Sequence, residues 1–134
     1  MSIVIDLARL TAALADFGAG YLVTTAADGR AKVVTVDPRD GDGDSDAEGA
    51  IVLPPSKGSA RNLVDNPAAT LVFPPVEPRG YTLLIDGTAV GGDHAIRFTP
   101  ESAVLHRPAS HGDGPQPPPG AGEPTGCASD CRPA

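Results

Sequence analysis

Hydroxyl, amine and guanidinium groups are concentrated in one short stretch of this chain, Ser56-Lys57-Gly58-Ser59-Ala60-Arg61. The stretch holds one of two lysines in the protein and stands at the start of a segment, 59–66, expected to be a short helix closed by Pro67. A helix N-terminus presents unpaired N–H groups and a partial positive charge, to which arginine adds a planar fork and lysine a mobile charge. The pattern predicts a phosphate-sized anion site. The alternative is that Ser59 caps a surface helix whose cations are solvated.

An acidic run at 40–48 has a composition that could suit calcium. An EF-hand loop needs glycine at its sixth position and a bidentate acid at its twelfth, whereas counting from Asp40 these positions are Ser45 and Ile51. We therefore expect a solvated, self-repelling turn, with weak calcium binding as the alternative.

Four zinc-type ligands stand near the end of the chain: His106, His111, Cys127 and Cys131. Fifteen mostly Pro, Gly and polar residues separate the two pairs, and their order is not that of a familiar zinc finger. Free thiols or a redox-sensitive Cys127–Cys131 pair are expected rather than structural zinc, and two cysteines cannot form the disulfide framework of a small secreted domain.

The charge balance of the 134-residue chain limits its partners. With 10 Lys+Arg against 17 Asp+Glu the formal net charge is −7, so the global positive surface that drives nucleic-acid binding is absent. No apolar run approaches the roughly 20 residues that span a bilayer, and the N-terminus lacks the basic start and small-residue cleavage site of a signal peptide. We expect a soluble cytoplasmic protein without a nucleic-acid or membrane partner.

Composition changes abruptly after Arg107. The segment 108–134 carries 7 of the 15 prolines and no Val, Ile, Leu, Met, Phe, Tyr or Trp. It is therefore expected to be a flexible tail behind a single folding unit, 1–107. A unit of this size buries a modest fraction of its surface, which favours association with a second copy.

Short strands dominate the folding unit. Asp6 is placed to cap an N-terminal helix with apolar residues at three- and four-residue steps up to Phe17, and Asp28-Gly29 favours a hairpin turn. The expected strands are 21–25, 32–36, 50–53, 70–73, 81–89 and 94–99, with a turn at 91–93. Because no regular βαβ alternation is present, the sequence predicts a mainly β (α+β) fold, a mostly antiparallel barrel or sandwich with peripheral helices.

The order of these elements resembles the FMN-binding split β-barrel family related to pyridoxamine 5′-phosphate oxidase, over about residues 5–107. The resemblance rests on five motifs in order: Gly20-Tyr21-Leu22-Val23-Thr24-Thr25, Asp28-Gly29-Arg30, Lys32-Val33-Val34-Thr35-Val36, Asn62-Leu63-Val64-Asp65-Asn66-Pro67 with the strand after it, and Asp86-Gly87-Thr88-Ala89. It implies an antiparallel split β-barrel with an N-terminal helix and a short helix between the third and fourth expected strands.

The resemblance also implies a cofactor site at a homodimer interface. Lys57, Ser59 and Arg61 would contact the FMN phosphate, with Ser56 and Asn62 nearby. The flavin ring would lie against the second and third strands, where Val33, Val34 and Thr35 would contact it. A deazaflavin or haem is a further cofactor that this fold could hold. A strand edge and β-branched side chains are physically suited to a flat ring.

The implied function is that of an FMN-dependent oxidoreductase acting on a small-molecule substrate, with no residue expected as general acid or base. A non-catalytic flavin-binding protein is the alternative. The chain after Arg107 has no Arg- and Ser-containing motif of the kind that holds the substrate phosphate in the authentic oxidase, so oxidation of pyridoxamine phosphate is not expected.

Overall fold

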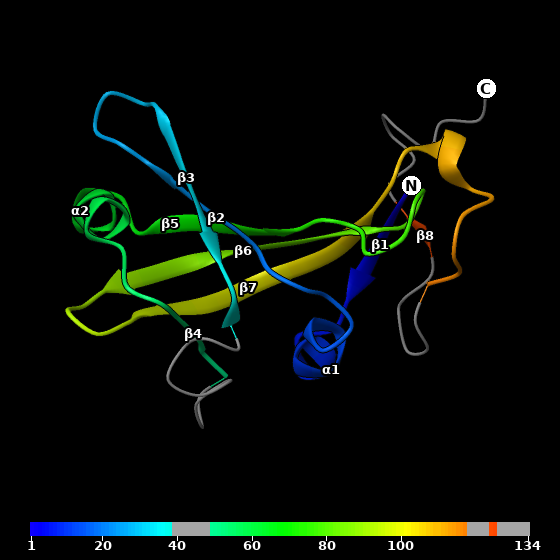
Figure 1. The fold of residues 1–134 in the computed structure, drawn as a ribbon, viewed down its shortest axis with the longest axis horizontal. Helices are drawn as coiled ribbons and strands as arrows, with labels where there is room; N and C mark the ends of the chain where they lie inside the picture. The colour runs from blue at the N-terminus through cyan, green and yellow to red at the C-terminus, as the bar shows by residue number, and fades with distance from the viewer. Residues whose placement is uncertain (39–48, 118–123, 126–134) are drawn as a thin grey trace.

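The computed structural model describes residues 1–38 and 49–117 and the backbone of 124–125 (Figure 1). It is a mainly β, α+β fold in which one antiparallel sheet is accompanied by a few short helices, and this confirms the fold class expected from the sequence. The strands are β1 (Ser2–Ile5), β2 (Gly20–Thr25), β3 (Ala31–Val36), β4 (Ile51–Leu53), β5 (Ala68–Phe73), β6 (Thr82–Gly91), β7 (Ile96–His106) and β8 (Pro124–Thr125). The helical elements are η1 (Leu7–Arg9), α1 (Leu10–Leu14), α2 (Lys57–Asp65) and η3 (Ala109–His111).

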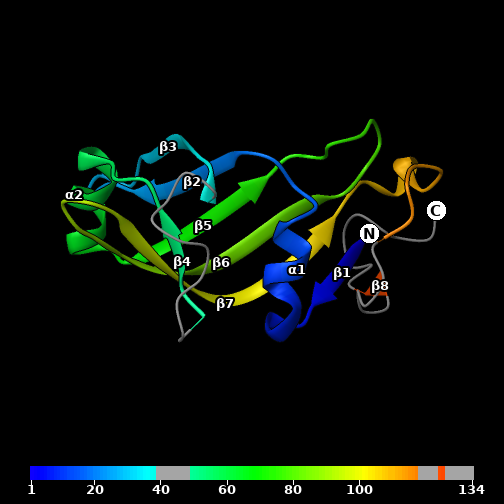
Figure 2. The ribbon, with the colours of Figure 1, turned by 60° about the horizontal axis from the view of Figure 1, so that its bottom comes forward.

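The strands pair in the order β3-β2-β5-β6-β7-β1-β8, with β4 also pairing with β7. All pairings are antiparallel. The long strands β6 and β7 run the length of the sheet, and Figures 1 and 2 place α2 near one end of them and the chain around η3 near the other. Among the described residues the pairing order starts at β3 and ends at β8, so closure into a barrel stays a prediction.

The expected hairpin is confirmed as β2 and β3. Its turn uses Gly29 at φ +88°, a backbone angle that glycine adopts without steric cost. The Asp28 carboxylate accepts a 3.0 Å hydrogen bond from the Arg30 amide, and the Ala26 amide donates to the Arg30 carbonyl at 2.8 Å. The Asp-Gly pair thus closes the turn as its chemistry predicts.

The hydrophobic core lies on one face of the sheet. Alternate residues of the central strands point inward, and the largest fully buried side chains are Phe73, Phe98, Ile3, Leu22, Ile51, Leu53, Leu71, Leu83, Ile85, Ile96 and Leu105. The same face receives α1 through Leu10 and Ala13 and α2 through Leu63. Burial of these side chains supplies the main favourable term of folding.

The N-terminal helix is shorter than the sequence predicts. Asp6 caps it as expected, accepting a 3.0 Å hydrogen bond from the Ala8 amide. Beyond Leu14 the chain tightens, because the amides of Asp16 and Phe17 each bond to a carbonyl three residues earlier. Phe17 packs with its ring centroid 6.3 Å from that of Phe73, so the last apolar residue of the pattern belongs to the turn that follows the helix.

Two strand assignments differ from expectation. β1 is not evident in the sequence, since four residues at a chain end carry little pattern, yet it pairs with the end of β7 and buries Ile3 and Ile5. β7 extends to His106 through Pro100, which lies at a register shift between Asp86 and Gly87 of β6. A bulge is where a strand tolerates proline.

Part of the expected tail makes defined contacts: η3 follows β7, and β8 pairs with β1. The acidic run 40–48 and both cysteines, Cys127 and Cys131, lie outside the described residues, so the calcium, zinc and redox hypotheses stay predictions. In the parts of the chain that are described, no helix has the length and apolar character needed to cross a membrane.

Candidate anion and cofactor site

The basic stretch forms the first turns of α2, which begins two residues earlier than expected. Its cap is Ser56 and not Ser59. The Ser59 amide donates to Ser56 Oγ at 3.3 Å, and the Ser56 hydroxyl donates to Ser59 Oγ at 3.0 Å. Ser59 is fully buried, so its hydroxyl serves this pair. The two serines therefore fix the start of the helix, which leaves the cations around it as the chemically available groups.

α2 is held tightly against the sheet. Asn62 Nδ2 donates a 3.1 Å hydrogen bond to Oγ1 of Thr24, a fully buried residue of β2. On the other side, a methyl group added to Gly91 of β6 would lie 2.8 Å from Cα of Ala60 and closer still to its Cβ. The glycine permits close approach of helix and strand, and Asn62 acts as a positioning residue for the helix.

Lys57 and Arg61, one helical turn apart on α2, are both exposed. They line an open depression of about 530 Å³ together with Pro55, Ala60, Val64, Gly91, Gly92 and Asp93. The wall formed by α2 is cationic, and Asp93 supplies a carboxylate from the turn between β6 and β7. This arrangement suits a ligand with an anionic end that also offers hydroxyl groups.

Lys32 is the site residue that sequence reasoning missed. Its side chain runs from β3 onto α2, because a methyl group added to Gly58 would lie 2.5 Å from Cε and 3.0 Å from Nζ of Lys32. Both lysines of the protein therefore lie at the first turn of one helix. A signal was present in the sequence: alternation in β3 puts Lys32 on the same face as Val34 and Val36, where an apolar residue is the usual choice.

The three residues expected to contact a flavin ring do not share a face of β3. Val33 is 57% exposed and lies with Thr35 on the outer face, while Val34 is half-buried and packs against the core. Among the described strands β3 pairs with β2 alone, so its other edge presents main-chain N–H and C=O groups. Val33 and Thr35 can offer side chains to a ring, and Val34 only its main chain.

The outer face of the sheet carries a cross-strand row of side chains that are apolar in every strand except β3, where the row ends on a threonine. The register aligns one residue from each of six strands, from β1 to β3: Val4, Val104, Leu84, Val72, Tyr21 and Thr35. Val4 is 54% exposed and Tyr21 is 41% exposed. An antiparallel sheet that faces water on one side is normally polar there, so this row, the outer apolar row, is unusual.

Fold and site together define a small antiparallel β protein with a cationic helix start. No family model matches the sequence. The chain is 34% identical over 138 residues to Uncharacterized protein Mb0449c of Mycobacterium bovis and, equally, to Uncharacterized protein MT0457 of Mycobacterium tuberculosis. Each alignment covers 95% of this chain and 92% of the relative. The chain belongs to the family of these mycobacterial proteins.

Proposed function

We propose that this protein binds FMN as a member of the class related to pyridoxamine 5′-phosphate oxidase and works as an FMN-dependent oxidoreductase on a small-molecule substrate. The observation that carries the proposal is that Lys32 of β3 reaches Gly58 in the first turn of α2, the helix on which Lys57 and Arg61 line an open depression. Three cations near one helix N-terminus favour local binding of an anion even in a protein whose net charge is −7.

The phosphate of FMN would be held by these three side chains. Arg61 offers a planar fork and the two lysines offer compact charges, and the partial positive charge of the helix start adds to them. Ser56 and Ser59 would act indirectly, by fixing the first turn through their mutual hydrogen bonds. Asn62 would hold the helix in place through Thr24.

The ring would lie along β3. Val33 and Thr35 supply an exposed β-branched surface, and the unpaired edge of the strand supplies hydrogen-bonding groups for the polar end of a flavin. The bound flavin supplies the redox chemistry by accepting and releasing hydride. The chain's own task is then to position the ring, exclude water and leave one ring face open to substrate.

A second copy of the chain would cover the outer apolar row. The row reaches Thr35, next to the expected ring position, so a partner on this face would also shield the ring from water. Burial of a stripe that crosses six strands removes apolar surface from water and supports a two-fold dimer.

Binding of FMN can be tested with Arg61→Ala. Loss of one charge-assisted contact of roughly 1.5–3 kcal/mol should weaken FMN binding about ten- to hundredfold. Riboflavin, which lacks the phosphate, should bind the wild type poorly and lose little further affinity. Arg9→Ala, which removes an exposed cation beside α1, is the matched control. Equal FMN affinity of wild type and Arg61→Ala in calorimetric titration would refute the site.

A non-catalytic flavin-binding protein is the second candidate. Among the described residues that line the depression, Asp93 is the one Asp, Glu, His or Cys, so this part of the site offers little acid–base chemistry of its own. Reduction of the bound flavin by nicotinamide cofactors, followed by flavin absorbance in stopped flow, separates the two. Turnover supports the oxidoreductase, and a flavin that is bound but never reduced by any donor supports the alternative.

A further inference from the structure

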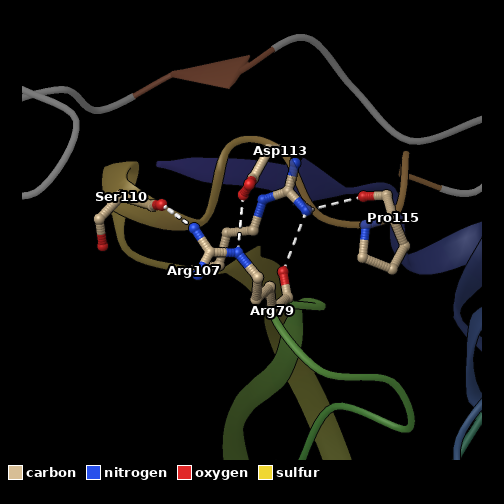
Figure 3. A network of polar contacts seen from close by, with 5 residues as sticks. All are labelled: Arg79, Arg107, Ser110, Asp113 and Pro115. Atoms are coloured by element: carbon tan, nitrogen blue, oxygen red, sulfur yellow. Dashed lines mark hydrogen bonds and ion pairs between the residues drawn. The ribbon is translucent and has the colours of Figure 1, made fainter.

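The strands β6 and β7 have one end near α2 and one end far from it (Figure 1). At the far end, two arginine side chains contact the same segment of the chain (Figure 3). The segment, residues 108–117, is called the strap below. Arg79 precedes β6; its Nε donates to the Asp113 carboxylate at 2.7 Å and its Nη2 to the Ser110 carbonyl at 2.5 Å. Arg107 follows β7, and its Nη1 donates to the Pro115 carbonyl at 2.7 Å. Three oxygen atoms of the strap thus accept hydrogen bonds from the two guanidinium groups.

Arg107 is buried without a carboxylate partner among the described residues. Only 3% of it is exposed, and its guanidinium carbon lies 4.0 Å from the centre of the Tyr81 ring. Besides Pro115, Nη1 reaches only the carbonyl of Arg79, at 3.3 Å, and the buried Nε has no acceptor in the described chain. A buried guanidinium is well compensated only by an anion and a full set of acceptors, which the strap does not supply.

Arg79 is held in a backbone conformation that favours glycine. Its φ is +63°, and it is the one non-glycine residue with positive φ in the described chain. Pro78 precedes it, and the Gly80 amide donates to the Glu77 carbonyl at 3.0 Å, so Arg79 occupies the turn position where glycine is the usual residue. Strained backbone of this kind is common at ligand-binding sites. Here the turn places the guanidinium group of Arg79 beside that of Arg107 (Figure 3).

We propose that Arg79 and Arg107 form a second oxyanion site, which accepts the phosphate or carboxylate group of a small-molecule ligand, and that the strap occupies this site as an internal competitor. Asp113 supplies the carboxylate that a ligand would replace, and Ser110 and Pro115 supply neutral oxygens. The competitor is weak, because the side chains of Arg79 and Asp113 are 47% and 73% exposed. Tyr81 would form an aromatic wall beside the ligand.

The strap fits this role in one further respect. A methyl group on Gly114 would collide with the carbonyl oxygen of Arg79, so the strap backbone lies directly on the turn that presents this arginine. Displacement of the strap would uncover both guanidinium groups together. The site lies apart from the proposed flavin site and is independent of it.

Titration with inorganic phosphate, followed by backbone amide NMR at constant ionic strength, tests the proposal. The amides of Gly80, Gly112 and Gly114 report on the second site, and those of Gly58 and Gly91 report on α2. We expect phosphate to move the first group in the wild type and to bind there about two- to fivefold more tightly in Asp113→Asn, because an exposed ion pair competes only weakly. A parallel titration with acetate distinguishes carboxylate from phosphate recognition.

Arg79→Gly is the variant that removes the second oxyanion site and keeps the fold. Glycine suits the positive φ, so this variant should fold, and it should lose the response of the Gly112 and Gly114 amides while Gly58 and Gly91 still respond. No movement of Gly112 and Gly114 by either anion in wild type and Asp113→Asn would overturn the second site without affecting the flavin proposal. An equal response in Arg79→Gly would also overturn it and would mean adventitious anion binding.

Discussion

The ammonium end of Lys32 on β3 lies across Gly58 in the first turn of α2, so a strand and a helix bring both lysines of the chain together. The contact depends on a residue without a side chain. Glycine is a poor helix former, and its presence in this turn is explained by the space that it leaves for Lys32.

The first prediction concerns Gly58→Ala. Alanine should favour the helix by about 0.5–1 kcal/mol, yet it should push the Lys32 ammonium out of the site and weaken FMN binding roughly five- to tenfold. Thermal unfolding and calorimetry with FMN and riboflavin measure the two effects separately. Gly18→Ala, with open space around the added methyl group, is the control. An unchanged FMN affinity in Gly58→Ala would remove Lys32 from the site.

The second prediction concerns the packing of α2 on β6. Gly91→Ala would force Ala60 and the helix backbone away from the strand. Overpacking of this kind costs about 1–3 kcal/mol, so chemical denaturation should show a lower free energy of unfolding. FMN affinity should fall as well, because Lys57 and Arg61 move with the helix. A variant with wild-type stability would mean that α2 can shift without cost.

The third prediction concerns the outer apolar row. Val4→Lys and Tyr21→Lys place a charge near the two ends of the row, at positions exposed enough for the monomer to tolerate the change. Light scattering should give twice the chain mass for the wild type and the mass of one chain for the variants. Val76→Lys, at a 66% exposed valine between β5 and β6, should leave the dimer intact. A wild-type monomer that binds FMN tightly would contradict the dimer.

The fourth prediction concerns pH. The hydrogen bond from Arg79 lowers the pKa of Asp113 below its ordinary value of 3.8. A carboxyl group with a lowered pKa in the folded state stabilises that state above its ordinary pKa, and this contribution is lost as pH falls through the lowered value. The strap should therefore stay attached at neutral pH and loosen only in acid below about pH 3.8. NMR titration of the Asp113 carboxyl carbon checks this, and in Arg79→Gly its pKa should return toward the ordinary value.

Local chemistry explains why much of the fold was predictable. Asp28-Gly29 specifies a tight turn, Pro54 follows β4 directly, and β2 and β5 are rich in β-branched and aromatic residues, so these elements lie close to where the pattern places them. β1 and the second half of β7 were missed because they depend on each other: Ile3 and Leu105 form a pair only when residues about a hundred positions apart meet. Such pairing has no local signal.

The candidate site divides in the same way. The hydroxyls and cations of 56–61 are neighbours in sequence, and a helix start gathers them whatever the rest of the chain does. Lys32 and Gly91 reach the site through the packing of α2 on β3 and β6. The alternation in β3 marks the face on which Lys32 lies, but no local pattern tells which helix packs there. The burial of Ser59 could not be predicted either, because a pair of capping serines can form on an exposed helix as well as on a buried one.

Pairing of β8 with β1 limits how these molecules can polymerise. A sheet with two long free edges can add further chains without end, as in fibrils. Here the strand beyond β1 is two residues long and begins with Pro124, which has no N–H to donate to a neighbour. β3 is then the long free edge of the described sheet, and a flavin bound along it would take up hydrogen-bonding groups that another strand would need. Removal of the chain beyond β7 should therefore uncover the short edge of β1 as a second place where another strand can pair.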